Sequence, residues 1–270
     1  RLHSMKIIRF DSGDGIHHGT PIDEKTALRI DGDILTHYVV SKEKLPIKKL
    51  LAPMYPTDIL CIGLNYREHA KESGSTLPEN PMLFIKASNS LNNPFDPIPI
   101  PRITHEVDYE CELVVVIGRD AKNVSRERAL DYVFGYTCGN DVSVRDWQRE
   151  KRLGGGQFAR GKSFDGHCPL GPWIVTKDEI PNPNALRIKT ILNGQTMQDS
   201  STADMIFDVP ALIASLSTTM TLRAGAVLLT GTPHGVGFAR TPPVWLKDGD
   251  VCVVEIEKIG RLENTVRNER

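Results

Sequence analysis

The apolar residues of this chain fall into many short runs, often β-branched or alternating with polar residues, and this pattern is typical of β-strands. In the N-terminal part, the predicted strands cover residues 6–10, 26–30 and 34–40. Clusters of Gly, Asp and Ser at 12–15 and 31–33 predict the turns between them. Residues 41–55, with four lysines and two prolines, are interpreted as a connector.

The rest of the chain continues this pattern. Further strands are predicted at residues 59–63, 82–85, 113–117, 173–176, 187–192, 226–229 and 251–256. Three segments have the apolar spacing and end signals of a helix. The first covers residues 66–72 with Asn65 as N-cap, the second extends from Ser125 through Val133, and the third opens at Asp208.

Many strands, few helices and no regular alternation of the two predict a mixed α+β, β-rich fold rather than a Rossmann fold or a TIM barrel. At roughly 150 residues per domain, 270 residues allow one large domain and a small appendage. We expect a small N-terminal β-rich domain over residues 5–55 and a catalytic domain over residues 57–265.

Charge and cysteine content limit the classes of partner. With 33 basic and 34 acidic residues, the formal charge of −1 argues against nucleic acid or an acidic membrane as partner. The longest aliphatic run, 113–117, is too short to span a bilayer. Five scattered cysteines without a C-x-x-C pair predict buried thiols in a reducing compartment. We therefore expect a cytoplasmic protein, or a mitochondrial one if a targeting segment precedes residues 1–4, which we interpret as an extension.

The most informative pattern is acidic. Asp108, Glu110 and Glu112 alternate with apolar residues, which predicts three acids on one face of a strand. A solvent-facing edge would explain them, but the strand continues into 113–117, which is apolar on both faces and indicates a central position. Buried neighbouring carboxylates need a compensating charge. A hard divalent cation fits, and Asp141 is a candidate for the third ligand.

Two further patterns are weaker. His69 and Glu72 lie three residues apart and would share a helix face, either as a general base with its orienting carboxylate or as a surface ion pair. Residues 156–163 fit the phosphate-binding loop G-x-x-x-x-G-K-S, but the flanking residues 145–152 and 164–169 predict neither the strand nor the helix that this loop requires. Lys162 is therefore a candidate functional residue, though not a nucleotide-binding one.

Taken together, these motifs resemble the fumarylacetoacetate hydrolase family. The segments that carry the resemblance are GLNYREHAKE at 63–72, VDYECELVVVIG at 107–118, GNDVSVRDWQ at 139–148, RGKSFDGHCPLGP at 160–172 and LTGTPHGVG at 229–237. They occur in the family's order and cover about residues 57–265. The closest similarity is to the short acylpyruvase and oxaloacetate-handling branch.

The resemblance implies a mixed β-sandwich roll, a homodimer and one Mg²⁺ or Mn²⁺ per subunit, with Ca²⁺ as a further possibility. It also implies roles for nine residues: metal ligands at Glu110, Glu112 and Asp141, catalytic groups at His69, Glu72 and Lys162, and substrate contacts at Arg145, Gln148 and Thr232. In the short branch, His69 and Glu72 belong to a lid over the site.

These residues suggest a hydrolase that cleaves a C–C bond in 2,4-dioxo acids of the acylpyruvate or fumarylpyruvate type. Glu72 would orient His69 to activate water, and the cation with Lys162 would stabilise the resulting enolate. The same core can instead decarboxylate oxaloacetate or exchange its keto and enol forms, so a lyase and a tautomerase are the alternatives. A non-catalytic ligand-binding protein is a more remote alternative.

Overall fold

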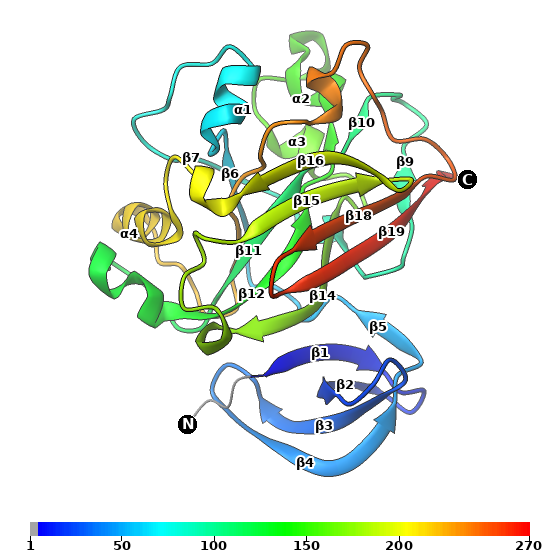
Figure 1. Ribbon diagram of the computed structural model, residues 1–270, viewed down its shortest axis with the longest axis vertical. Helices are drawn as coiled ribbons and strands as arrows, with labels where there is room; N and C mark the ends of the chain where they lie inside the picture. The colour runs from blue at the N-terminus through cyan, green and yellow to red at the C-terminus, as the bar shows by residue number, and fades with distance from the viewer. Residues whose placement is uncertain (1–4) are drawn as a thin grey trace.

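The computed structural model describes residues 5–270, so the interpretation of residues 1–4 lies outside the described range. The architecture is β-rich with few helices, as the sequence predicts (Figure 1). Within residues 5–270, no helix is both long enough and apolar enough to cross a membrane.

The larger sheet has twelve strands. These are β1 (Lys6–Asp11), β2 (Ile16–Pro21), β3 (Thr26–Asp33), β4 (His37–Pro46), β5 (Lys49–Leu51), β6 (Ile59–Gly63), β7 (Met82–Ile85), β8 (Leu91–Asn92), β11 (Cys111–Ile117), β12 (Val133–Asn140), β14 (Cys168–Thr176) and β17 (Val227–Leu229). Their order is β4-β3-β2-β1-β14-β12-β11-β17-β6-β7, with β5 beside β1 and β8 beside β14.

A second sheet has five strands in the order β16-β15-β18-β19-β9. They are β9 (Ile98–Ile100), β15 (Arg187–Leu192), β16 (Gln195–Ser201), β18 (Val251–Ile256) and β19 (Gly260–Asn268). The short strands β10 (Val107–Asp108) and β13 (Ser143–Val144) pair with each other. The α-helices are α1 (Arg67–Glu72), α2 (Arg145–Arg149), α3 (Ala159–Lys162) and α4 (Val209–Thr219). In Figure 1, α1, α2 and α3 gather at the end of the molecule opposite β1–β4.

The N-terminal strands have a small core of their own, made by Ile8, Phe10, Ala27 and Leu45. β1 also pairs with β14, so these strands extend the larger sheet. A turn lies at 12–15 as predicted, but it joins β1 to β2, a strand that the sequence analysis did not predict, and the strand predicted at 34–40 begins only at His37. The division of the chain into domains at 5–55 and 57–265 stays a prediction.

Two expectations for the N-terminal part were wrong. The cluster 31–33 does not form the turn, because β3 runs through it to Asp33 and the chain reverses at residues 34–36. The side chain of Asp33 accepts a hydrogen bond from the Leu35 N–H at 2.9 Å, which starts the turn at the last residue of the cluster. The predicted connector 41–55 contains the end of β4 and all of β5.

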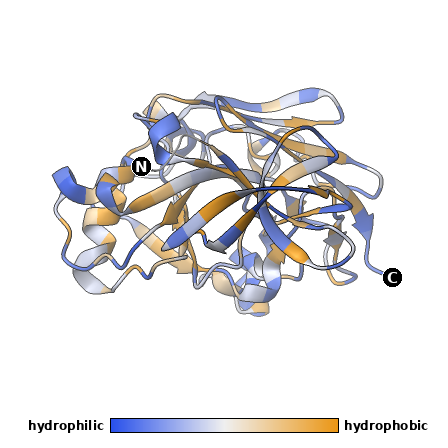
Figure 2. Cartoon of the chain, turned by 90° about the horizontal axis from the view of Figure 1, so that it is seen from below, coloured by the Kyte–Doolittle hydropathy of each residue, from blue (hydrophilic) through white to orange (hydrophobic). Residues whose placement is uncertain are grey.

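The centre of the molecule is built around β11, all seven residues of which are buried. It lies between β12 and β17 and runs antiparallel to both. Leu113, Val115 and Ile117 pack into a core cluster with α4, whereas Val114 and Val116 join the cluster on the other face. Each such side chain stabilises the fold by about 1.5–3 kcal/mol. Figure 2 shows hydrophobic positions, in orange, along strands in the middle of the molecule. The prediction of a central strand is therefore confirmed.

The helix predictions had mixed outcomes. α4 begins as predicted, since the Asp208 side chain accepts a hydrogen bond from the Ala211 N–H at 2.9 Å. The second segment is a 3₁₀ helix at Arg126–Tyr132, and Val133 already belongs to β12, where pairing with β11 outweighs its helical spacing. The first helix begins at Arg67 rather than at residue 66, and Asn65 is not its N-cap.

Candidate active site

The start of β11 and the end of β12 bring three carboxylates together. Cys111 pairs with Asn140, so Asp141 lies close to Glu110 and Glu112 although it is far from them in the sequence. One ligand oxygen from each lies within 4.8 Å of the other two, and all three residues are buried. We call Glu110, Glu112 and Asp141 the carboxylate cluster.

Asp108 is not part of this cluster, which corrects the expectation that it shares a strand face with the other acids. The strand is interrupted between β10 and β11, and Asp108 lies on the separate short ladder with β13. Its carboxylate accepts hydrogen bonds from the N–H groups of Gly237 at 2.8 Å and Phe238 at 3.0 Å.

Three buried cations surround the carboxylate cluster. Lys162 Nζ lies 2.7 Å from an oxygen of Glu110 and 2.7 Å from an oxygen of Asp141. Lys86 Nζ lies 2.6 Å from the second oxygen of Asp141. Arg145 donates to the second oxygen of Glu110 at 2.7 Å. Two of the three acids are therefore each flanked by two cations.

Glu110 and Asp141 form salt bridges, whereas Glu112 forms none within the described chain. Its carboxylate accepts a hydrogen bond from the Gly231 N–H at 2.8 Å. Burial, together with the charges of Asp141 and Glu110, raises the pKa of Glu112. For Glu110, burial alone would raise the pKa, but Lys162 and Arg145 lower it to about 2.

These features test whether the residues fit the divalent cation that the resemblance implies. Three converging carboxylates are the donor set that hard cations prefer, and zinc would favour nitrogen or sulfur ligands. A dication would also relieve the repulsion that raises the pKa of Glu112. The carboxylate cluster therefore fits a hard divalent cation.

Lys162 reaches the cluster from the end of α3. α3 follows α2 closely, and Gly161 makes this approach possible, because a Cβ atom there would lie 2.6 Å from the backbone nitrogen of Gln148. The phosphate-loop pattern at 156–163 is not preceded by a strand, since α2 and a 3₁₀ turn at Lys151–Leu153 come before it. Lys162 therefore does not belong to a phosphate-binding loop, and its ammonium group pairs with the carboxylates of Glu110 and Asp141.

Lys86 is the buried site residue that the sequence analysis missed. It directly follows the edge strand β7, is 1% exposed, and donates to the Val142 carbonyl as well as to Asp141. The only sequence signal is a lysine at the end of an apolar run. That signal is weak, because its partner lies 55 residues away.

The His69–Glu72 pair is formed within α1. His69 Nδ1 lies 3.1 Å from Glu72 Oε2, and the Glu72 carboxylate also accepts from the Gly235 N–H at 2.9 and 3.2 Å. Burial would raise the pKa of Glu72, but the hydrogen bonds from His69 and Gly235 lower it. The pair is thus tied to the glycine-rich turn after β17.

His69 and part of the carboxylate cluster face one cavity of about 340 Å³. Its polar lining includes Glu110, Arg145, Gln148, Lys162 and Thr232, and its apolar lining includes Ile62, Leu64, Met82, Phe84, Phe158 and Phe238. The cavity therefore combines acid–base groups and cations with apolar walls, as small-molecule sites do.

The three predicted substrate contacts all line this cavity, but they differ in how they are bonded. Arg145 binds Asp108, Glu110 and Gln148 through its three nitrogens, so it orients neighbouring side chains. The Thr232 hydroxyl donates to the Cys111 carbonyl at 3.0 Å and accepts from Gln198. Gln148 accepts from Arg145 through its oxygen, and its amide nitrogen has no acceptor among the described residues.

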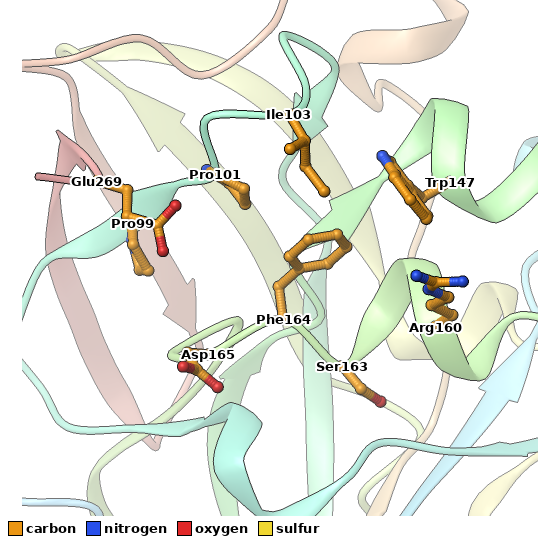
Figure 3. A pocket seen from close by; sticks show the side chains of 9 residues that line it. All are labelled: Pro99, Pro101, Ile103, Trp147, Arg160, Ser163, Phe164, Asp165 and Glu269. Atoms are coloured by element: carbon orange, nitrogen blue, oxygen red, sulfur yellow. The ribbon is translucent and has the colours of Figure 1, made fainter. Parts of the chain in front are cut away.

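A second cavity, of about 290 Å³, contains none of the predicted site residues (Figure 3). Trp147 and Arg160 lie on one side of it, and Pro99 and Glu269 lie on the other. The guanidinium of Arg160 is 4.4 Å from the centre of the Trp147 ring.

The five cysteines, as predicted, are buried free thiols.

Comparison with known proteins identifies the family of the chain. Residues 58–267 match the family described as fumarylacetoacetate (FAA) hydrolase, C-terminal. The chain therefore belongs to the fumarylacetoacetate hydrolase family and is an enzyme of that family.

Three relatives indicate the range of activities. The mitochondrial oxaloacetate tautomerase fahd2 of Xenopus laevis is 49% identical over 218 residues, which is 80% of this chain and 68% of that protein. The 5-carboxymethyl-2-hydroxymuconate delta-isomerase of Mycobacterium smegmatis is 36% identical, with a TM-score of 0.86 over 98% of this chain and 100% of its own. A fumarylacetoacetate hydrolase of Exiguobacterium antarcticum is 38% identical, with the same TM-score and coverage.

Proposed function

We propose that this chain is a divalent-cation-dependent tautomerase that exchanges the keto and enol forms of oxaloacetate or of a closely related 2-oxo acid. The names of the Xenopus tautomerase and the mycobacterial isomerase favour this alternative over the C–C bond hydrolase that we expected first. The observation that carries the proposal is that His69, Lys162 and Glu110 of the carboxylate cluster line one cavity.

A bound divalent cation would polarise the 2-oxo group and favour loss of a neighbouring proton. The residues of the chain supply the proton transfers. Glu72 engages Nδ1 of His69, so Nε2 is the nitrogen that takes the proton from C3. The C–H electron pair becomes the C2–C3 double bond, and charge develops on the 2-oxygen. Lys162 stabilises that charge, and the protonated imidazole delivers its proton to the oxygen.

The hydrolase remains the second candidate, because the same His69–Glu72 pair can deprotonate water. The fumarylacetoacetate hydrolase of Exiguobacterium antarcticum has this fold, so the architecture is compatible with that chemistry. Tautomerisation nevertheless needs fewer components, since no water has to be positioned and no C–C bond breaks. Decarboxylation of oxaloacetate requires neither the water nor the base, so it would leave the His69–Glu72 pair without a role.

We propose Mg²⁺ as the cation, because three carboxylates suit its preference for hard oxygen ligands, and Mn²⁺ can replace it. The homodimer and the cellular location also remain predictions. Light scattering on the purified protein tests the first, and microscopy of the tagged chain tests the second.

The decisive experiment adds enol-oxaloacetate to the purified protein with Mg²⁺ or with EDTA. Malate dehydrogenase and NADH then report the keto form as it appears, and separate assays follow pyruvate release and acetylpyruvate cleavage. We expect Mg²⁺-dependent keto formation that is lost in His69→Asn. The control Glu68→Gln changes an exposed acid of the same helix and should retain activity. Acetylpyruvate cleavage without accelerated keto formation would instead establish the hydrolase.

A further inference from the structure

One cation of the active-site cavity has no role in the proposed proton transfers. Arg145, Arg149 and Lys162 are the lysine and arginine side chains that line the cavity. Arg145 and Lys162 bind buried carboxylates, as described above. Arg149, the last residue of α2, forms no salt bridge with any residue between 5 and 270.

The side chain of Arg149 packs on an aromatic ring and forms no salt bridge in the described chain. Its guanidinium carbon lies 4.1 Å from the centre of the Phe238 ring, and that ring is itself part of the cavity wall. Stacking on an aromatic face leaves the edge of a guanidinium free to donate hydrogen bonds. Arg149 is also exposed, so it belongs to the open side of the cavity rather than to its floor.

We infer that Arg149 binds the far carboxylate of a C4 2-oxo dicarboxylate, and that it thereby selects dicarboxylic over monocarboxylic 2-oxo acids. This inference rests on the proposed function, because it assumes that the 2-oxo acid end of the ligand lies at the carboxylate cluster. The inference adds the residue that recognises the second carboxylate, at the opposite end of the ligand.

The reach of the side chains supports this assignment. Arg145 and Arg149 are four residues apart on α2, so they project from the same side of the helix. The guanidinium carbons of both lie within 5.6 Å of the Phe238 ring centre, so they cannot be more than about 10 Å apart. Arg145 touches Glu110 of the carboxylate cluster.

A C4 diacid is long enough for a span of this size. Its two carboxyl carbons are separated by three C–C bonds, or roughly 4 Å, and a hydrogen bond at each end adds about 3 Å. A ligand held at the carboxylate cluster can therefore present its second carboxylate to Arg149. A monocarboxylic 2-oxo acid would leave Arg149 facing water and the apolar wall.

The test uses two unreactive ligands that differ only in the far group. Malate and lactate both carry a 2-hydroxy acid end, and malate alone carries a second carboxylate on the adjacent carbon. Calorimetry measures the Kd of each for wild type, Arg149→Gln, Arg149→Lys and the control Arg152→Gln, with Mg²⁺ at saturation. Arg152 belongs to the same surface segment, but it pairs with Glu150 and does not line the cavity.

We expect Arg149→Gln to weaken malate binding about tenfold and lactate binding less than twofold, since a charge-assisted hydrogen bond is lost for malate alone. Arg149→Lys should recover part of the malate affinity, and Arg152→Gln should match wild type for both ligands. The KM for oxaloacetate should rise with the malate Kd, whereas kcat should change little.

Equal effects of Arg149→Gln on malate and lactate, or no effect on either, would overturn the role of Arg149. The proposed function fails separately. A wild-type protein that prefers malate over lactate through Arg149, but does not accelerate keto–enol exchange, would refute the tautomerase and leave the carboxylate recognition intact.

Discussion

Replacing Lys86 with methionine removes a positive charge from the most enclosed ion pair at the site. The Lys86–Asp141 pair has a separation of 2.6 Å, and the two side chains are 0% and 1% exposed. Methionine keeps much of the length of the side chain but cannot donate to Asp141 or to the Val142 carbonyl. Asp141 retains Lys162 as a partner, so it is weakened rather than isolated.

The chain offers a matched control for the magnitude. Lys49 and Asp96 form an ion pair of similar length, 2.8 Å, but their side chains are 50% and 29% exposed. Removing one partner of a buried pair costs about 3–5 kcal/mol, because a charge is left in a low-dielectric environment. Exposed pairs contribute about 0.2–1 kcal/mol. With Lys162 still in place, we expect Lys86→Met to cost about 3 kcal/mol and Lys49→Met under about 1 kcal/mol.

The free energy of unfolding is measured by urea denaturation in EDTA, and the Mg²⁺ affinity is measured by calorimetry. Lys86 adds positive potential beside the carboxylate cluster, so its removal should tighten Mg²⁺ binding while it lowers the stability of the metal-free protein. At one hundred times its Kd, Mg²⁺ raises the free energy of unfolding of a variant by about 2.7 kcal/mol. Wild type gains a similar amount, so Mg²⁺ should narrow the difference between the two proteins only to the extent that Lys86→Met binds it more tightly. The reasoning would be refuted if Lys86→Met were no more destabilising than Lys49→Met, or if it weakened Mg²⁺ binding.

Three further predictions concern other positions. Asp141→Asn should abolish calorimetric Mg²⁺ binding, whereas Asp199→Asn, at an exposed pair with Arg187, should leave it unchanged. Gly161→Ala should lower kcat/KM about 100-fold by moving Lys162, because the new Cβ would lie 2.6 Å from the Gln148 backbone nitrogen; unchanged kinetics would contradict the close packing of α2 and α3. Burial lowers the pKa of His167 to about 3, so the unfolded chain gains a proton below pH 6.5 that the folded chain takes up only near pH 3. The unfolding free energy of wild type should therefore fall between pH 6.5 and pH 4, and His167→Asn should show a shallower fall in urea titrations.

The sequence predicts the centre of the fold well because burial there depends on local pattern. The run 113–117 is apolar on both faces and becomes the central strand β11, and the acids just before it reach the carboxylate cluster. The strands β2 (IHHGTP) and β16 (QTMQDSS) contain no apolar run of this kind. They become strands because neighbouring strands offer hydrogen-bonding partners, and that information is not local.

The same distinction applies to the site residues. Glu110, Asp141 and His69 belong to motifs whose spacing carries information, whereas Lys86 and Arg149 are single basic residues in an ordinary context. Their importance becomes visible only when the fold gives one of them a buried carboxylate and places the other on the wall of the active-site cavity. Charge partners that lie far apart in the chain cannot be assigned from one sequence.

The three cations around the carboxylate cluster are not equivalent, and their other contacts distinguish their roles. Lys86 is also bound to the Val142 carbonyl, and Arg145 is also bound to Asp108 and Gln148, so both have anchors outside the cluster. The hydrogen bonds of the Lys162 ammonium group in the described chain go to cluster carboxylates alone. Lys162 also lines the cavity, whereas Lys86 does not. A change in the charge of the cluster therefore acts most directly on Lys162, which makes it the cation best able to transfer its hydrogen bonds from the carboxylates to a substrate oxygen.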